Sequence, residues 1–197
     1  MYAIDYRPNG AGRAAPMDPV EYEDTMAAIE TARRVAFVDG ERIALTGGSH
    51  GGHVMNRMAS RVNARCAVLS SPTWIDSDQM RRGIDREKDA ATVERLKLLL
   101  SFVDQIKDPA VRAAFDRASA LAETAEVRMP LLIIDGEEDV SLPQWMVNEY
   151  VAKLRGAGKT VETYLPKTGN HGFDNGSSPE GREAQRRTME FLKRHLE

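Results

Sequence analysis

The chain has 197 residues, 42% hydrophobic and 29% charged, a composition typical of one globular domain with a sizeable core. Its 27 basic residues nearly balance 30 acidic ones, and the formal net charge of −3 gives no support for a nucleic-acid partner. No apolar run approaches the roughly 20 residues that span a bilayer, so we expect no membrane association. No secretory signal is visible, which favours a cytoplasmic location. The only cysteine is Cys66, so a disulfide within the chain is excluded.

Short apolar runs alternate with longer amphipathic stretches along the chain. The apolar runs predict strands at residues 2–6, 43–46, 67–69, 131–134 and 160–165. The amphipathic stretches predict helices at residues 18–36, 54–61, 143–154 and 179–195. This alternation predicts a mostly parallel sheet with helices on both faces, and so a single α/β domain over residues 1–197.

Residues 72–129 depart from this alternation. They contain no convincing strand and are predicted to form helices, including residues 90–102 and 109–122. We interpret them as a helical lid inserted in the domain, because an insertion of this kind over a parallel sheet favours a lid over a second domain. Trp74, near the start of the insertion, is a candidate for lining the substrate pocket, and ordinary packing within the lid is the alternative.

The sequence Gly-Gly-Ser-His-Gly around Ser49 matches the Gly-x-Ser-x-Gly motif, and it stands between a predicted strand and a predicted helix. The chain must reverse so sharply there that the serine takes a strained conformation. We expect Gly47 and Gly51 to avoid collisions with backbone, and Gly52 to let the helix approach the sheet. Ser49 is the predicted nucleophile, and the backbone N–H of His50 is a predicted oxyanion donor. A phosphate-binding loop is the alternative, but the lysine of a P-loop and the spacing of a dinucleotide fingerprint are missing.

A serine nucleophile needs a base, and the base needs an acid that orients it. In sheets with this motif the order along the chain is serine, acid, histidine. His171 follows the last predicted strand and is the candidate base, and Asp139 follows the strand before it and is the candidate acid. Both come at carboxyl ends of strands, where such sheets place their chemistry. Asp135 remains a rival acid, whereas Glu137 and Glu138 are expected to face solvent.

Together these blocks resemble the catalytic domain of the prolyl oligopeptidase family and its dienelactone-hydrolase-like esterase relatives. The matching blocks are residues 2–7, 42–52, 130–140 and 170–173. The resemblance implies an α/β-hydrolase fold and a serine hydrolase, in which Ser49, Asp139 and His171 cleave a peptide or ester bond of a peptide or small-molecule substrate by acyl transfer. It implies no cofactor, and the histidines lack the His-Glu-x-x-His spacing of a metal site. Dienelactone hydrolases use a cysteine nucleophile, so that activity is disfavoured.

The sequence departs from the family pattern at its start. The family has strands before the segment that residues 2–7 resemble, and a His-Gly-Gly-type loop that supplies a second oxyanion N–H. No such loop precedes Ser49. If residues 2–6 form the fourth strand of the fold, the central strand beside it is missing, and buried backbone groups would lack partners. We therefore expect the natural chain to start earlier, unless residues 2–6 pair directly with residues 43–46.

Three functions are compatible with these residues. The first is an active serine peptidase or esterase. The second is a catalytically silent hydrolase-like fragment that serves as an interaction module, and the third is a small-molecule receptor that kept the pocket. A fluorophosphonate probe separates the first from the others, because it labels only an activated serine.

The expected gap in the sheet yields a prediction about the purified chain. Residues 1–197 alone should be poorly stable and weakly active, because unpaired backbone groups in a sheet are costly. Thermal unfolding and ester hydrolysis measure the two properties. A sharp thermal transition together with robust hydrolysis would contradict the prediction.

Overall fold

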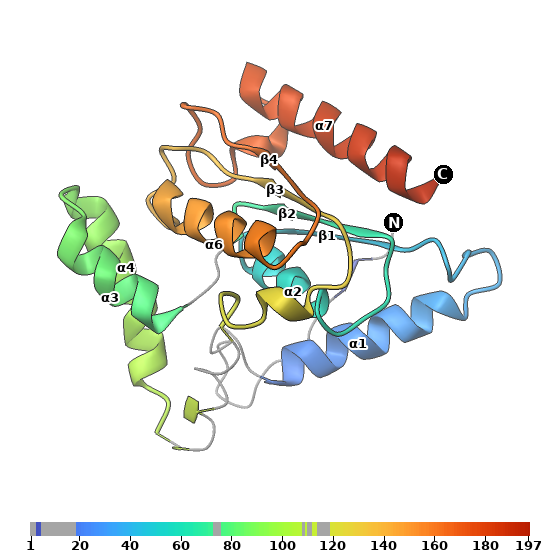
Figure 1. Cartoon of the computed structure of the whole chain (residues 1–197), viewed down its shortest axis with the longest axis horizontal. Helices are drawn as coiled ribbons and strands as arrows, with labels where there is room; N and C mark the ends of the chain where they lie inside the picture. Colours follow the sequence, from blue (N-terminus) through green and yellow to red (C-terminus); the bar gives the residue numbers. More distant parts are fainter. Residues whose placement is uncertain (1–2, 5–18, 73–75, 108, 110–111, 114–118) are drawn as a thin grey trace.

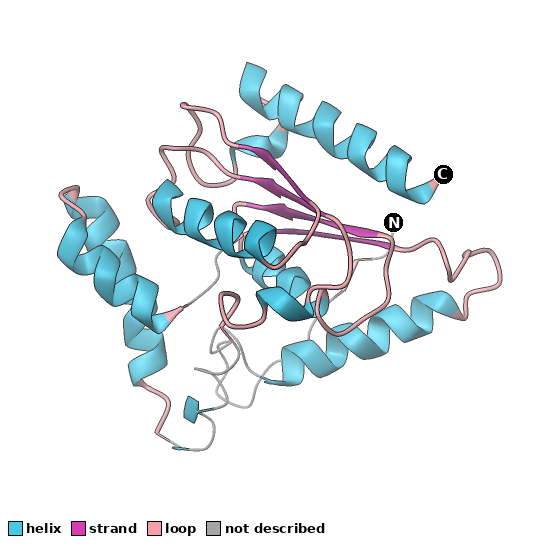
Figure 2. Ribbon diagram, in the orientation of Figure 1, coloured by secondary structure: helices cyan, strands magenta, loops and turns pink. Residues whose placement is uncertain are grey.

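The computed structural model describes residues 3–4, 19–72, 76–107, 109, 112–113 and 119–197. Its centre is a four-stranded sheet in the order β1-β2-β3-β4. Each strand pairs in parallel with the next, so all the carboxyl ends meet at one edge of the sheet (Figure 2). The strands are β1 (Ala44–Gly48), β2 (Cys66–Ser70), β3 (Leu131–Ile134) and β4 (Val161–Tyr164).

Helices cover both faces of the sheet (Figure 1). One face carries α1 (Pro19–Arg33), α2 (His50–Met58) and α6 (Gln144–Gly156), and the other carries α7 (Pro179–Leu196). Between β2 and β3 lie α3 (Ser77–Arg86) and α4 (Ala90–Asp104), which pack on each other beyond α6, and the short 3₁₀ helix η1 (Thr124–Glu126). A second 3₁₀ helix, η2 (Phe173–Asn175), precedes α7.

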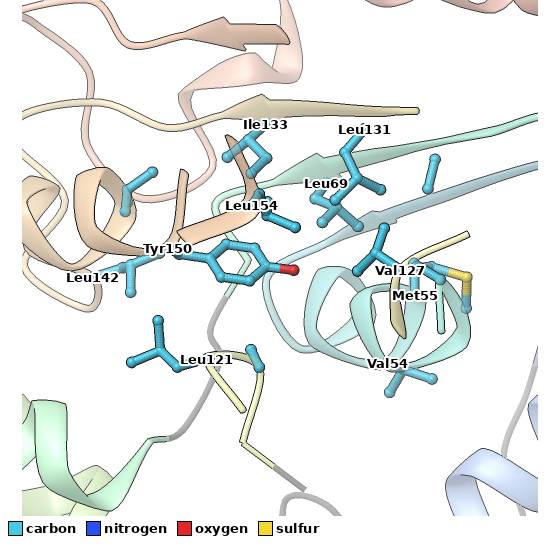
Figure 3. Close-up of a cluster of buried hydrophobic side chains, with 14 of the residues drawn as sticks. Val54, Met55, Leu69, Leu121, Val127, Leu131, Ile133, Leu142, Tyr150 and Leu154 are labelled. Carbon is cyan, nitrogen blue, oxygen red and sulfur yellow. The ribbon is translucent and has the colours of Figure 1, made fainter. Parts of the chain in front are cut away.

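Two hydrophobic clusters hold the layers together, because successive strand residues face opposite sides of a sheet. Leu69, Leu131 and Ile133 face α2 and α6, where Figure 3 shows them beside Tyr150 and Leu154. A smaller cluster lies under α7 and is formed by Cys66, Val68, Leu132, Ile134, Phe173, Ala184 and Phe191. The buried Tyr150 hydroxyl also donates a hydrogen bond of 2.6 Å to Asn56 and so ties α6 to α2.

The structure confirms most of the predicted elements. Strand β3 has the predicted bounds, and α6 and α7 begin and end within two residues of theirs. Helix α1 ends three residues earlier than predicted, and there the Arg33 guanidinium binds the carbonyl groups of Gly40 and Asn63. Helix α2 begins at His50, four residues earlier than predicted, because the turn at Ser49 leads directly into the helix.

Other expectations fall on the segments where the description has gaps. Residues 119–122 form a turn and not the predicted end of a helix. The Ser119 hydroxyl accepts the Leu121 N–H, and the backbone carbonyl of Ser119 accepts the Ala122 N–H. The rest of that predicted helix is only partly described. Trp74 lies outside the described residues, and so does most of the predicted strand 2–6. Of that strand Ala3 and Ile4 are described, without strand pairing, and Ile4 packs half-buried against the larger cluster.

The packing of α7 yields a test of stability. Phe191 is fully buried between α7 and the sheet, whereas Met189 on the same helix is 66% exposed. Phe191→Ala should lower the free energy of unfolding by about 3–5 kcal/mol. Met189→Ala is the matched control and should change it by less than about 0.5 kcal/mol. Urea unfolding followed by circular dichroism measures both, and equal effects would contradict this account of how α7 docks.

Candidate active site

The turn after β1 holds Ser49 in a backbone conformation that residues with a side chain rarely adopt, with φ 51° and ψ −121°. Its N–H donates to the Ser70 carbonyl at 2.9 Å and continues the pairing with β2 by one residue. Its carbonyl accepts the His53 N–H at 3.1 Å in the first turn of α2. Ser49 is therefore at once the end of a strand and the N-cap of a helix, which places it at the carboxyl edge of the sheet.

The glycines around this turn differ in what they do. A Cβ at Gly47 would lie 2.3 Å from the Gly51 carbonyl oxygen, so glycine is required there, as expected. A Cβ at Gly52 would lie 3.0 Å from Pro72, so this glycine allows α2 to approach the segment after β2. The expectation for Gly51 is wrong, because a Cβ at that position would meet no described atom within 4 Å.

Three predicted site residues from distant parts of the chain form one hydrogen-bonded series. His171 Nε2 lies 2.8 Å from Ser49 Oγ, and His171 Nδ1 lies 2.6 Å from Asp139 Oδ2. The other oxygen of Asp139 accepts the backbone N–H groups of Ser141 and Leu142, at 2.7 and 3.2 Å. Because an ionised carboxylate only accepts, Nδ1 carries the proton, and Nε2 is left to accept the serine hydroxyl. The arrangement suits a serine nucleophile, a base and an orienting acid.

Backbone contacts hold the acid loop against the histidine loop. A Cβ at Gly136 would lie 2.1 Å from the Gly169 carbonyl oxygen, so the two loops touch at main-chain distance. The Glu138 N–H donates to the same carbonyl at 3.2 Å. Beside them Ser71, which also has a positive φ of 39°, accepts the Gly172 N–H at 3.2 Å. No role for Ser71 was predicted from the sequence, although its place directly after the apolar run of β2 was a usable signal.

The predicted oxyanion donor, His50, is the first residue of α2, so its backbone N–H lies at the positive end of the helix. Its side chain donates from Nε2 to Glu21 Oε2 at 2.9 Å, and the Glu21 side chain is buried. Glu21 was missed in the sequence. It lies four residues before Thr25 and eight before Ile29, both buried, so a carboxylate on the buried face of α1 was the available signal.

Asp135, the rival acid, is fully buried next to the site but is not the acid bonded to His171. Burial, together with the neighbouring Asp139 carboxylate, raises the pKa of Asp135 to about 9. Glu137 and Glu138 are exposed, as expected. The acid loop thus holds two buried carboxyl groups, Asp135 and Asp139, of which Asp139 is the one bonded to His171.

A cleft of about 580 Å³ lies beside the acid loop. It is bounded by that loop, by the connection from α3 to α4 and by the start of α6, and it is lined by Glu87, Asp89, Ala91, Thr92, Glu137, Glu138, Asp139, Val140, Pro143, Gln144 and Trp145. Within the described part of the chain, no three His, Cys, Asp or Glu side chains gather as a metal site requires. None of the described helices has the length and apolar character needed to cross a membrane.

Comparisons with solved structures define the class. The fold is that of an α/β-hydrolase, a parallel sheet between helical layers. The chain superposes on Pyrococcus horikoshii acylaminoacyl peptidase with a TM-score of 0.69 at 24% identity, over 89% of this chain and 28% of that one. It superposes on the esterase rPPE with a TM-score of 0.72 at 22% identity, over 98% and 63% of the two chains. For a Pyrococcus furiosus esterase the TM-score is 0.68 at 23% identity, over 98% and 69%.

Sequence comparison defines the family. A profile of the prolyl oligopeptidase family matches residues 14–197, and the chain belongs to that family. It is also 27% identical to the uncharacterized peptidase YuxL of Bacillus subtilis (strain 168), over 82% of this chain and 23% of that protein. The chain therefore spans about a quarter of the length of this relative and of the acylaminoacyl peptidase.

The two glycines of the nucleophile turn provide a matched pair for a test. Gly47→Ala places a methyl group against the Gly51 carbonyl and should lower the free energy of unfolding by more than about 2 kcal/mol. Gly51→Ala meets open space in the first turn of α2 and should be neutral or stabilising by up to about 1 kcal/mol. Urea unfolding of the two variants checks both signs, and a destabilised Gly51→Ala would contradict the geometry of the turn.

Proposed function

We propose that this chain carries the active site of a serine hydrolase that cleaves a peptide or ester bond through an acyl-enzyme intermediate. The observation that carries the proposal is the position of His171. Its Nε2 lies 2.8 Å from Ser49 Oγ, while its Nδ1 is held at 2.6 Å by a buried carboxylate that two backbone N–H groups also bind. A surface histidine without a catalytic role would need neither the serine hydroxyl on one ring nitrogen nor the buried carboxylate on the other.

The geometry supports a two-step acyl transfer. As Ser49 Oγ attacks the substrate carbonyl, His171 Nε2 takes its proton, and the Asp139 carboxylate stabilises the resulting imidazolium. The negative charge that develops on the substrate oxygen is stabilised by the backbone N–H of His50 at the start of α2. The imidazolium then gives its proton to the leaving group. Water, activated by the same histidine, releases the acyl group and restores Ser49.

The substrate class proposed is a peptide or an ester, because the structural neighbours comprise both an acylaminoacyl peptidase and esterases. We further propose that α3 and α4 act as a lid. The connection between them lines the cleft beside the acid loop, so a substrate in that cleft would contact both the lid and the loop that holds Asp139. A cytoplasmic location remains part of the proposal.

A fluorophosphonate probe tests the proposed function, because it modifies only a serine that a base has activated. The folded wild-type chain should be labelled, and Ser49→Ala should abolish the labelling. Asp139→Asn should slow it roughly 10⁴-fold, because the histidine loses the partner that fixes its tautomer. Intact-protein mass spectrometry measures the labelling rate, and it detects even slow labelling.

Ser177→Ala is the control, because Ser177 is exposed and lies outside the series of Ser49, His171 and Asp139. It should be labelled at the wild-type rate. Equal labelling of Ser49→Ala and wild type would contradict the assignment of the nucleophile. A folded wild-type chain that is never labelled would instead favour the interaction module or the small-molecule receptor.

A further inference from the structure

A second carboxyl group lies behind the acid that orients His171. Asp135 is the first residue after β3, and its side chain has no exposure to solvent. Neither of its oxygens accepts a hydrogen bond of ordinary geometry from a described residue. Its strongest interaction with another side chain is with the carboxyl group of Asp139, and the backbone N–H of Gly136 and the Ser71 hydroxyl are weaker neighbours.

The two carboxyl groups have opposite surroundings. Asp139 receives two backbone N–H groups and the His171 ring, which together stabilise an ionised carboxylate. Asp135 has only the weaker Gly136 N–H and Ser71 hydroxyl nearby, neither at ordinary hydrogen-bond geometry, and an ionised carboxylate buried without stronger donors is very unfavourable. Two adjacent buried carboxylates also repel each other, so only one of the pair ionises readily. The surroundings select Asp139 as the charged member and Asp135 as the neutral one.

We propose that Asp135 is a positioning residue that keeps its proton and donates it in a hydrogen bond to the Asp139 carboxylate, which in turn orients His171. The proposal deepens the function proposed above and depends on it. The pair then carries one negative charge, and the acid is held from both sides, by His171 in front and by Asp135 behind. From the sequence Asp135 was a rival of Asp139 for the role of the acid, whereas in this proposal the two residues are partners.

Loss of the proton should impair the site. An ionised Asp135 could no longer donate to Asp139 and would repel it, which would loosen the acid that holds His171. The raised pKa of Asp135, about 9, places this change in the alkaline range. Other titratable groups on the described surrounding segments are Glu137 and Glu138, exposed on the same loop, and Lys167, exposed after β4. Two more are Tyr164, half-buried at the end of β4, whose carbonyl accepts the Asp135 N–H, and Asp174, which accepts from Ser70. None of these is buried as Asp135 is.

The pH dependence of fluorophosphonate labelling tests the proposal. Wild-type labelling should fall at least tenfold between pH 8 and about 10.5, because Asp135 ionises in this range. Asp135→Asn keeps the shape of the side chain and a hydrogen-bond donor but cannot ionise. The fall of its labelling rate at high pH should therefore disappear or move up by at least one pH unit. Asp135→Leu has no donor, so its labelling at pH 7.5 should be at least tenfold slower than that of Asp135→Asn.

Glu137→Gln is the matched control, since it removes a carboxylate from the same loop at an exposed position. It should keep the wild-type decline, and circular dichroism in the same buffers shows that every variant stays folded. An identical decline in wild type and Asp135→Asn would overturn the positioning role, and so would equal labelling of Asp135→Asn and Asp135→Leu. Absence of labelling in folded wild type at every pH would overturn the proposed function as well.

Stability provides a readout that does not need activity. The unfolded chain ionises Asp135 near pH 4, whereas the folded chain keeps the proton up to about pH 9. Between these values the wild type loses stability as the pH rises, and Asp135→Asn is spared this loss. The urea midpoint of Asp135→Asn should therefore rise relative to wild type from pH 5 to pH 8.5. A constant difference would overturn the assignment of the proton, whether or not Ser49 is labelled.

Discussion

The parallel register of the four strands is the constraint on which the site depends. Gly48, Ser70, Ile134 and Tyr164 stand at the same level across the sheet, so the chain leaves every strand at one edge. The residues that follow are therefore neighbours in space although more than a hundred positions can separate them in sequence. A shift of one residue between β2 and β3 would displace Asp139 relative to Ser49 and would move the side chains of one strand to the opposite face of the sheet. The hydrophobic clusters on both faces oppose such a shift, because each strand residue is buried against a particular helical layer.

The site is built mostly from main-chain contacts at this edge. Ser49 and Ser71 both adopt positive φ angles that cost about 1–3 kcal/mol each, and such strain persists only where the surroundings hold it. The strand pairing of Ser49 and the contact of Ser71 with Gly172 supply that support. The backbone of Ser49 is thus fixed by the fold itself, which is the preorganisation that the proposed acyl transfer would require.

Features set by neighbouring residues, such as the ends of strands, could be predicted from the sequence. The apolar run of β3 is bounded by Pro130 and by a polar loop, so both ends of the strand could be predicted. The order of serine, acid and histidine was expected from the nucleophile motif, and the carboxyl ends of the predicted strands then located the acid and the histidine. The contact between Glu21 and His50 could not be predicted, because it depends on how α1 lies against α2. The role of Gly51 was mispredicted for a related reason: a motif shows that a glycine occurs, whereas the need for it depends on which atoms surround it.

The contact between Glu21 and His50 extends the site to a helix that carries none of the reacting groups. Each residue advances an α-helix by about 100°, so inserting one residue between Glu21 and the buried Ile29 would swing the carboxylate away from the imidazole. The residue types at exposed positions of α1 can vary, but the number of residues between Glu21 and Ile29 cannot. In evolution this stretch of α1 should tolerate substitutions far better than insertions or deletions, because only the latter change the angle between Glu21 and Ile29 around the helix axis.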